Sequence, residues 1–215
     1  CSSDLNVITG MYTPDAGQFL LQGRPYEPTA VHDVARAGIA RTFQNIRLFG
    51  EMTALENVMV GRHVRTDSGV WGAVFRSRGF VAQERAMAEH AQALLEEVGL
   101  GDSAGLKART LSYGDQRRLE IARALATEPV LLALDEPAAG MNPTEKVQLR
   151  ELIDRIRRER CTVLLIEHDV KLVMGLCDQV TVLDHGRVIC QGTPAHVQAD
   201  AKVIEAYLGT GAQHV

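Results

Sequence analysis

The sequence lacks long apolar runs, clustered cysteines and a marked excess of either charge. Its longest apolar runs have only the length of a strand, so none of them could span a bilayer. A net charge of −4 gives no reason to expect nucleic acid as the main partner. The cysteines are scattered, without a CxxC pair or metal-ligand spacing, which fits a reducing compartment and argues against a disulfide framework or a zinc site. They are Cys1, Cys161, Cys177 and Cys190.

What the sequence does contain is a composition typical of a globular protein, with 46% apolar and 23% charged residues. Its 215 residues leave room for one domain. The most informative segment is PVLLALDEP at 129–137. An unbroken apolar run of this length predicts a parallel strand that is buried on both faces.

Asp135 and Glu136 follow at the carboxyl end of that predicted strand, where open α/β sheets bind their ligands. A magnesium–nucleotide hydrolase needs such a pair, because the aspartate can hold the metal and the glutamate can orient or deprotonate the attacking water. The same two residues are also compatible with a strand that simply leaves the core through an acidic turn.

The remaining pattern predicts an α/β fold in which strands alternate with helices. We expect short strands at 18–22, 39–43 and 161–166, and a hairpin around His185-Gly186. Amphipathic helices are predicted at 32–37, 83–98, 116–126, 143–156 and 199–208. The alternation over the second half implies a parallel, doubly wound sheet flanked by helices. Residues 45–110 are mainly helical and lie between two strands, so we expect a helical subdomain inserted into a single domain spanning 1–215.

Four features follow one another in a fixed order along the chain. They are Gln44 after a strand, LSYGDQ at 111–116 before a helix, Asp135-Glu136, and His168 after another strand. In this order and spacing, from Asn6 onward, the chain resembles the ATP-binding cassette (ABC) ATPases. Gln44 matches the family's Q-loop and LSYGDQ its signature motif. Asp135-Glu136 matches the Walker B motif with its catalytic glutamate, AAGMN at 138–142 the D-loop, and His168 the switch histidine.

The resemblance implies a role for each matched residue in a reaction of ATP with Mg²⁺. Asp135 would bind Mg²⁺ through a water molecule, and Glu136 would polarise the hydrolytic water. Gln44 would contact metal or water and report on the membrane partner. His168 would donate a hydrogen bond to the γ-phosphate. The chemistry would be in-line phosphoryl transfer to water.

Other matched residues would serve the nucleotide of a partner subunit across a dimer, as the family does. They are Ser112, Gly114, Gln116 and Asn142. A helix start with a serine hydroxyl, an unhindered glycine backbone and free N–H groups suits a γ-phosphate. Both segments also have a purely structural explanation, because each predicts a capping box at the start of a helix, Ser112 with Asp115 and Asn142 with Glu145.

The P-loop pattern G-x-x-x-x-G-K-[ST] does not occur within the 215 residues. Sliding the pattern onto the chain places Cys1 where the lysine belongs, and Ser2 then becomes a candidate ligand for Mg²⁺. We therefore expect that the N-terminal strands and the P-loop are missing from this sequence. As written, the chain is expected to bind ATP poorly and to hydrolyse it negligibly. An unpaired sheet edge is expected to reduce its stability or to promote aggregation.

Within the ABC family, three segments resemble the ATPase subunits of branched-chain amino-acid importers: RTFQNIRLF at 41–49, PAAGMNP at 137–143 and VIEAYLG at 203–209. Lipopolysaccharide-export ATPases are similar around the signature and remain an alternative. The short distance from Gln44 to Ser112 leaves no room for the long coiled coil of chromosome-maintenance relatives. A further alternative is a non-catalytic cassette without a P-loop, which would pair with an intact one.

The resemblance also implies partners and a location. A second ABC ATPase subunit and integral membrane permease subunits would bind the chain directly, and a substrate-binding protein would act with it indirectly. The complex would lie at the cytoplasmic face of the cell membrane. The loosely patterned segment 63–80, with Trp71 and Phe75, is a candidate contact for the permease, and a solvated mobile loop is the alternative.

Overall fold

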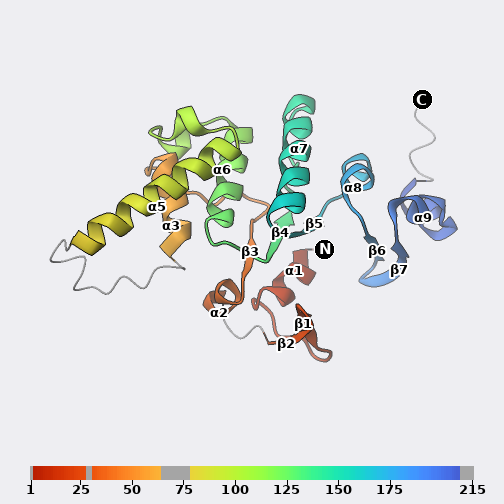
Figure 1. Cartoon of the computed structure of the whole chain (residues 1–215). Coiled ribbons are helices and arrows are strands. Elements are labelled where there is room, and N and C mark those ends of the chain that lie inside the picture. Colours follow the sequence, from red (N-terminus) through yellow and green to blue (C-terminus); the bar gives the residue numbers. More distant parts are fainter. Residues whose placement is uncertain (1, 28–30, 64–77, 209–215) are drawn as a thin grey trace.

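The computed structural model describes residues 2–27, 31–63 and 78–208 (Figure 1). Trp71 and Phe75 of the candidate permease contact lie outside these residues. The strands are β1 (Phe19–Leu21), β2 (Arg24–Tyr26), β3 (Ile39–Arg41), β4 (Leu131–Asp135), β5 (Thr162–Ile166), β6 (Val180–Asp184) and β7 (Arg187–Gly192).

The helices follow the same numbering as Figure 1. They are α1 (Ser2–Ile8), α2 (Val31–Arg36), α3 (Ala54–Arg62), α5 (Arg78–Glu97), α6 (Tyr113–Leu125), α7 (Pro143–Glu159), α8 (Val170–Leu176), α9 (Pro194–Ala199) and α10 (Ala201–Val203). Short 3₁₀ turns occupy Gly101–Ser103 (η2) and Ala108–Thr110 (η3), and a π-helical turn occupies Ile204–Leu208 (η4). Among the described residues, none of the helices combines the length and the apolar character that a membrane span requires.

The centre of the molecule is a parallel sheet of three strands in the order β3-β4-β5. Strand β4 lies in the middle, and its Leu132, Ala133 and Leu134 are fully buried, as the apolar run predicts. The register pairs Asp135 with Ile166 of β5. The carboxyl ends of these neighbouring strands therefore meet at one edge of the sheet, where the polar residues that follow them come together.

Helices cover both faces of this sheet, with α6 and α7 on one side and α1 on the other (Figure 1). Helix α7 begins where the sequence predicts, with Asn142 as its N-cap, Pro143 in its first turn and a complete capping box to Glu145. Its apolar stripe, which includes Leu149 and Ile153, is buried, and the helix packs against strand β5 of the sheet. The predicted doubly wound arrangement is thus present around the three parallel strands.

Between β3 and α6 the described residues include helices α3 and α5, which pack against each other (Figure 1). Helix α3 starts at a capping box in which Thr53 accepts from the Glu56 N–H and Glu56 accepts from the Thr53 N–H. Helix α3 also crosses α6 at Gly61. A Cβ atom added at Gly61 would collide with the backbone carbonyl oxygen of Arg123, so only glycine allows this close approach.

Replacing Gly61 by alanine should lower the free energy of unfolding by about 1–3 kcal/mol, because the two helices must move apart. The loss is expected even though alanine favours an exposed helix over glycine by about 1 kcal/mol. Urea unfolding followed by circular dichroism measures it. The matched control is Gly105→Ala in the same region, where an added Cβ meets nothing within 4 Å. An equal effect of the two substitutions would contradict this account of the helix crossing.

The C-terminal part contains the predicted hairpin, β6–β7, which turns at His185 and Gly186 with φ angles of 47° and 76°. It forms an antiparallel pair apart from the central sheet. The predicted closing helix over 199–208 is present but begins two residues later. Helix α9 ends at Ala199, the Asp200 side chain accepts from the N–H groups of Lys202 and Val203, and α10 continues without a gap into η4 as far as Leu208.

An apolar cavity of about 580 Å³ lies between β5 and β6. Side chains of both strands line it, together with Leu5 and Ile8 of α1 and Val173 of α8. Within the described residues, β5 is hydrogen-bonded to β4 alone. The β5 residues Val163 to Ile166 are consequently only half-buried, in contrast to the fully buried middle of β4.

Candidate functional site

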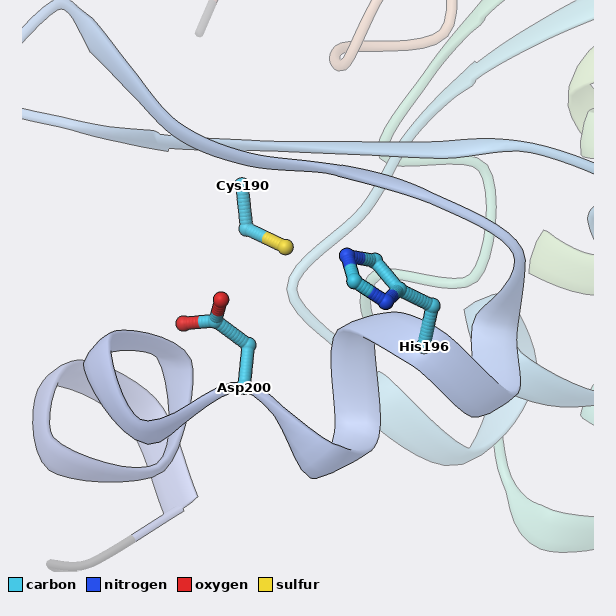
Figure 2. A group of neighbouring side chains, drawn as sticks. All are labelled: Cys190, His196 and Asp200. Carbon is cyan, nitrogen blue, oxygen red and sulfur yellow. The ribbon is translucent and has the colours of Figure 1, made fainter.

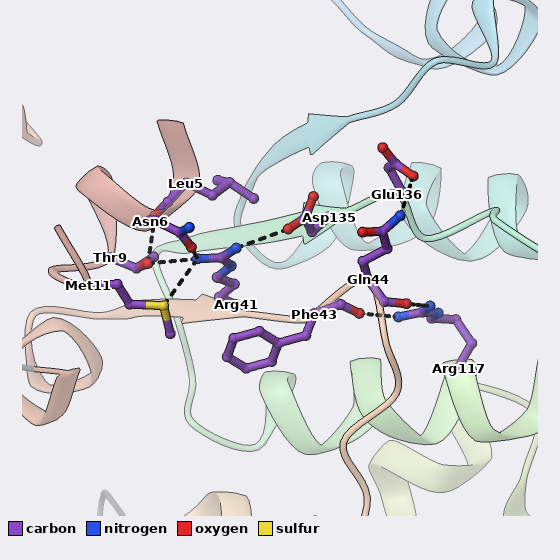
Figure 3. A network of polar contacts seen from close by, with 10 residues as sticks. All are labelled: Leu5, Asn6, Thr9, Met11, Arg41, Phe43, Gln44, Arg117, Asp135 and Glu136. Atoms are coloured by element: carbon purple, nitrogen blue, oxygen red, sulfur yellow. Dashed lines mark hydrogen bonds and ion pairs between the residues drawn. The ribbon is translucent and has the colours of Figure 1, made fainter. Parts of the chain in front are cut away.

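Three residues predicted to take part in hydrolysis come together at the carboxyl edge of the sheet. The Gln44 side chain donates from Nε2 to Glu136 Oε2 at 2.9 Å (Figure 3). His168 Nδ1 lies 3.8 Å from the same carboxylate oxygen. The His168 side chain is 74% exposed and Gln44 is exposed as well, so both can reach a ligand from solvent. The arrangement converges on the Glu136 carboxylate.

Glu136 has an unusual backbone conformation for a residue with a side chain, with φ at 45°. Non-glycine residues in the left-handed region are uncommon and cost free energy, so the surroundings must hold them there. Here the Glu136 N–H donates to the Ile166 carbonyl oxygen of β5 at 2.9 Å. This hydrogen bond holds the turn after β4 against the neighbouring strand β5. It therefore fixes the backbone position from which the candidate catalytic side chain of Glu136 extends.

Asp135, the predicted metal ligand, is buried and forms an ion pair with Arg41 of β3 at 2.9 Å (Figure 3). Arg41 also donates to Asn6 Oδ1 at 2.7 Å and to Thr9 Oγ1 at 3.0 Å, which ties α1 to the strand. Sequence reasoning missed this arginine. The available signal was a cation in a predicted buried strand, since buried charges need a partner.

The side chains at this edge suit Mg²⁺ by chemistry, because the Asp135 carboxylate and the Gln44 amide oxygen are hard oxygen ligands. The Arg41 guanidinium already contacts Asp135 Oδ2, so a bound ion would have to share the carboxylate with it or displace it. The structure places Ser2 at the start of α1 but describes nothing of its side chain. Its predicted role as a metal ligand therefore stays a prediction.

Arg117 of α6 is a second cation that sequence reasoning missed, and its side chain is 0% exposed. It donates to the carbonyl oxygens of Phe43 and Gln44, each at 2.6 Å (Figure 3). It also forms an ion pair with Glu120 at 2.8 Å. The backbone that carries Gln44 is thus fastened to α6. Burial raises the pKa of Glu120, and the positive charge of Arg117 opposes that shift.

The predicted signature residues have local structural roles at the start of α6. Ser112 is exposed and its hydroxyl accepts from the Asp115 N–H at 3.1 Å. The predicted capping box is incomplete, because the Asp115 carboxylate forms an ion pair with Arg118 instead. The helix begins at Tyr113 rather than at Gln116. The Gln116 side chain points back and donates to the Leu111 carbonyl oxygen at 2.9 Å.

Gly114 is buried against the start of α7. A Cβ atom at this position would lie 2.7 Å from Glu145 Oε1, a side chain that the Asn142 capping box holds in place. Tyr113 covers Gly140 in the same way, with its ring 3.4 Å from an added Cβ. The segments 112–116 and 138–142 therefore pack on each other within one chain. Whether Ser112, Gly114, Gln116 and Asn142 also bind a partner's nucleotide stays a prediction.

Comparison with known proteins now decides the family. The sequence profile of the ABC transporter family matches residues 1–139. The chain is 46% identical over 205 residues to the high-affinity branched-chain amino acid transport ATP-binding protein BraF of Pseudomonas aeruginosa. This match covers 95% of this chain and 80% of BraF. The chain belongs to the ABC transporter family.

A further relative of this ABC protein is the high-affinity branched-chain amino acid transport ATP-binding protein LivG of Escherichia coli K12. The two are 43% identical, and the match covers 95% of this chain and 80% of LivG. The lipopolysaccharide export system ATP-binding protein LptB of Acidithiobacillus ferridurans is 32% identical, and the match covers 94% of this chain and 78% of LptB. A profile described as branched-chain amino acid ATP-binding cassette transporter matches residues 187–213. A cassette crystallised in its ADP conformation superposes with a TM-score of 0.81, at 31% identity over 97% of this chain and 83% of its own.

In the vocabulary of this family, two buried side chains connect the motifs. Arg117 joins the backbone at Phe43 and Gln44, the segment that resembles the family's Q-loop, to α6. Glu167, whose side chain is 1% exposed, accepts from the Ala138 N–H at 2.8 Å and from the His168 N–H at 3.2 Å, which joins the segment 138–142 to His168. Next to it, Asp169 caps α8, and a hydrogen bond from Lys146 holds the pKa of Asp169 below its usual value.

Proposed function

We propose that the chain is the ATP-hydrolysing subunit of an ABC importer for branched-chain amino acids. The observation that carries the substrate class is the high identity to BraF, together with the C-terminal match at residues 187–213. The lower identity to LptB makes lipopolysaccharide export the weaker candidate. We further propose one ABC ATPase domain over 1–215, with residues 45–110 as its helical subdomain.

The proposed chemistry is attack of water on the γ-phosphate of ATP. Glu136 would orient this water and accept its proton, while the Gln44 amide holds the carboxylate in place as it does at 2.9 Å. His168 would turn its exposed imidazole toward the γ-phosphate. A bound Mg²⁺, held by Asp135 with help from Gln44 and Ser2, would supply charge neutralisation for the phosphates.

The partners proposed are a second cassette and membrane permease subunits, with a substrate-binding protein acting indirectly. The complex would lie at the cytoplasmic face of the membrane. Ser112 supports the dimer because its hydroxyl is exposed at a helix start, where it can meet a phosphate held by another subunit. Gly114, Gln116 and Asn142 would shape that surface from behind.

The chain of 215 residues is expected to bind Mg-ATP only weakly. The sequence contains no glycine-rich loop with its lysine, and charge-assisted phosphate contacts are the strong ones in such a site. Isothermal titration with Mg-ATP measures the affinity. The matched control is the same chain extended ahead of Asn6 by a segment that carries a P-loop. Saturable binding at micromolar concentration by the unextended chain would contradict the prediction.

Transport is the direct test of the substrate class. The extended chain is reconstituted in vesicles with the permease and substrate-binding subunits of a branched-chain amino-acid importer, and ATP-driven uptake of leucine is measured against uptake of lysine. Leucine uptake supports the proposal. ATP hydrolysis without any uptake would reject the substrate class, and uptake driven by the unextended chain only beside an intact second cassette would favour the non-catalytic alternative.

A further inference from the structure

Three side chains of metal-binding type converge in the C-terminal part of the molecule, apart from Gln44, Glu136 and His168 at the carboxyl edge of the sheet. Cys190 belongs to β7, His196 to α9, and Asp200 to the break between α9 and α10 (Figure 2). Their ligand atoms all lie within 4.8 Å of one another. Cysteine spacing gave no sign of this group, because only one of the three is a cysteine.

The backbone positions each of the three for an identifiable reason. Cys190 is 7% exposed and points from β7 toward the small apolar cluster that includes Val197 and Val203. His196 lies in the first turn of α9, which Thr193 caps. Its ring packs on Gly192, where a Cβ atom would lie 2.7 Å from His196 Cδ2. A larger residue at 192 would push the imidazole away from Cys190.

Asp200 is held in place by the helix that it begins. Its Oδ1 atom accepts from the Lys202 N–H at 2.9 Å and from the Val203 N–H at 3.3 Å. Both capping bonds use the same oxygen, and Figure 2 shows the carboxylate lying beside the Cys190 sulfur. Burial raises the pKa of the Cys190 thiol, and the nearby Asp200 charge and its hydrogen bond with the thiol raise it further.

We propose that Cys190, His196 and Asp200 form a transition-metal site that binds Zn²⁺. Thiolate, imidazole and carboxylate are the three ligand types that Zn²⁺ takes in proteins, whereas Mg²⁺ and Ca²⁺ require oxygen ligands. Three protein ligands leave a fourth position for water or for a donor from another molecule. This site is independent of the ATPase assignment and goes beyond it.

A metal at this point would connect strand β7, helix α9 and the turn into α10. These segments enclose a small apolar cluster in which Cys190, Val197 and Val203 are buried. A Zn²⁺ ion binds the folded arrangement better than the unfolded chain, so it should stabilise the C-terminal segment 187–203. The zinc-bound form would therefore resist heat and proteolysis in this region more than the metal-free form.

The first experiment measures Zn²⁺ binding to the full chain in competition with a chromophoric chelator. It uses a Cys1→Ser background, because an N-terminal cysteine can chelate metal by itself. We expect one Zn²⁺ per chain. Cys190→Ser, His196→Gln and Asp200→Asn should each weaken binding by at least about 10–100-fold, since even indirect changes around a metal site cost that much. Asparagine retains the helix cap, so Asp200→Asn tests the ligand without removing the fold's support.

Matched controls are Cys177→Ser and His185→Gln, which alter the same residue types elsewhere and should leave the affinity unchanged. A second measurement uses Co²⁺, whose absorption reports a thiolate ligand; this band should vanish in Cys190→Ser. The melting temperature should rise with added Zn²⁺ in the parent chain but not in His196→Gln, whose side chain is exposed. No binding at equimolar Zn²⁺, or equal binding by parent and variants, would overturn the proposal.

Discussion

Replacing Arg117 by methionine is expected to lower the free energy of unfolding by about 3–5 kcal/mol, the cost of leaving one partner of a buried ion pair alone. Arg117 and Glu120 have side chains that are 0% and 1% exposed, so the variant would bury the Glu120 carboxylate without its cation. The carbonyl oxygens of Phe43 and Gln44 would also lose their donors. Urea unfolding at neutral pH measures the loss.

Two variants separate this explanation from a general effect on α6. Arg118→Met removes the neighbouring ion pair with Asp115, which is partly exposed, and should cost less than about 1 kcal/mol. Arg117→Met combined with Glu120→Leu should recover much of the loss, because no unpaired charge remains. If Arg117→Met is no more damaging than Arg118→Met, the buried pair does not stabilise the Q-loop as proposed.

The pH dependence of Arg117→Met follows from the same pair. Burial already raises the pKa of Glu120 above 4.5, and removal of the arginine should raise it further. A group whose pKa is higher in the folded state favours folding at low pH, and this benefit is lost as the pH rises. The deficit of the variant should therefore be smaller below about pH 4.5 than at pH 7.

The second large effect concerns Glu136→Gln in the chain extended by a P-loop segment. We expect steady-state ATP hydrolysis to fall by about 10²–10⁴-fold, the usual contribution of a positioned general base. Glutamine has nearly the same shape but cannot accept the proton of the attacking water. Phosphate release measures the rate, and nucleotide binding measured in parallel should change little because Glu136 acts on the water rather than on the phosphates.

The matched control for this loss is Glu151→Gln, an exposed glutamate on α7 that should leave hydrolysis unchanged. Gln44→Ala tests the hydrogen bond to Glu136 and should give a smaller loss, since the carboxylate itself remains. Hydrolysis that survives Glu136→Gln at more than about one tenth of the parent rate would remove Glu136 from the role of general base.

Local sequence patterns predicted much of the fold because short-range physics decides those features. The apolar run before Asp135 gave the buried strand β4, and the capping box at Asn142 gave the start of α7. The pattern failed where a side chain had competing partners. Asp115 binds Arg118 instead of completing a capping box, and Asp200 caps the last helix, which therefore starts two residues later than predicted.

The order of the motifs was enough to recognise the ABC family, because that order is a property of the sequence itself. In the sequence Gln44, Glu136 and His168 each follow a predicted strand, and the structure places these strands side by side, so that the three side chains meet at one edge. What the sequence could not supply were the partners of buried charges. Arg117 and Arg41 look like ordinary cations until the fold encloses them.

The sequence by itself thus determined the buried strand β4, the start of α7 and the family. Only the tertiary structure decided that Arg41 pairs with Asp135, that Arg117 holds the Q-loop, and that Cys190 faces a histidine and an aspartate. The physical reason is the distance along the chain over which each interaction acts. Helix caps and periodicity act between residues a few positions apart, whereas a buried ion pair or a mixed ligand group forms between distant segments. The free energy of such a group depends on burial, which exists only after packing has removed the water.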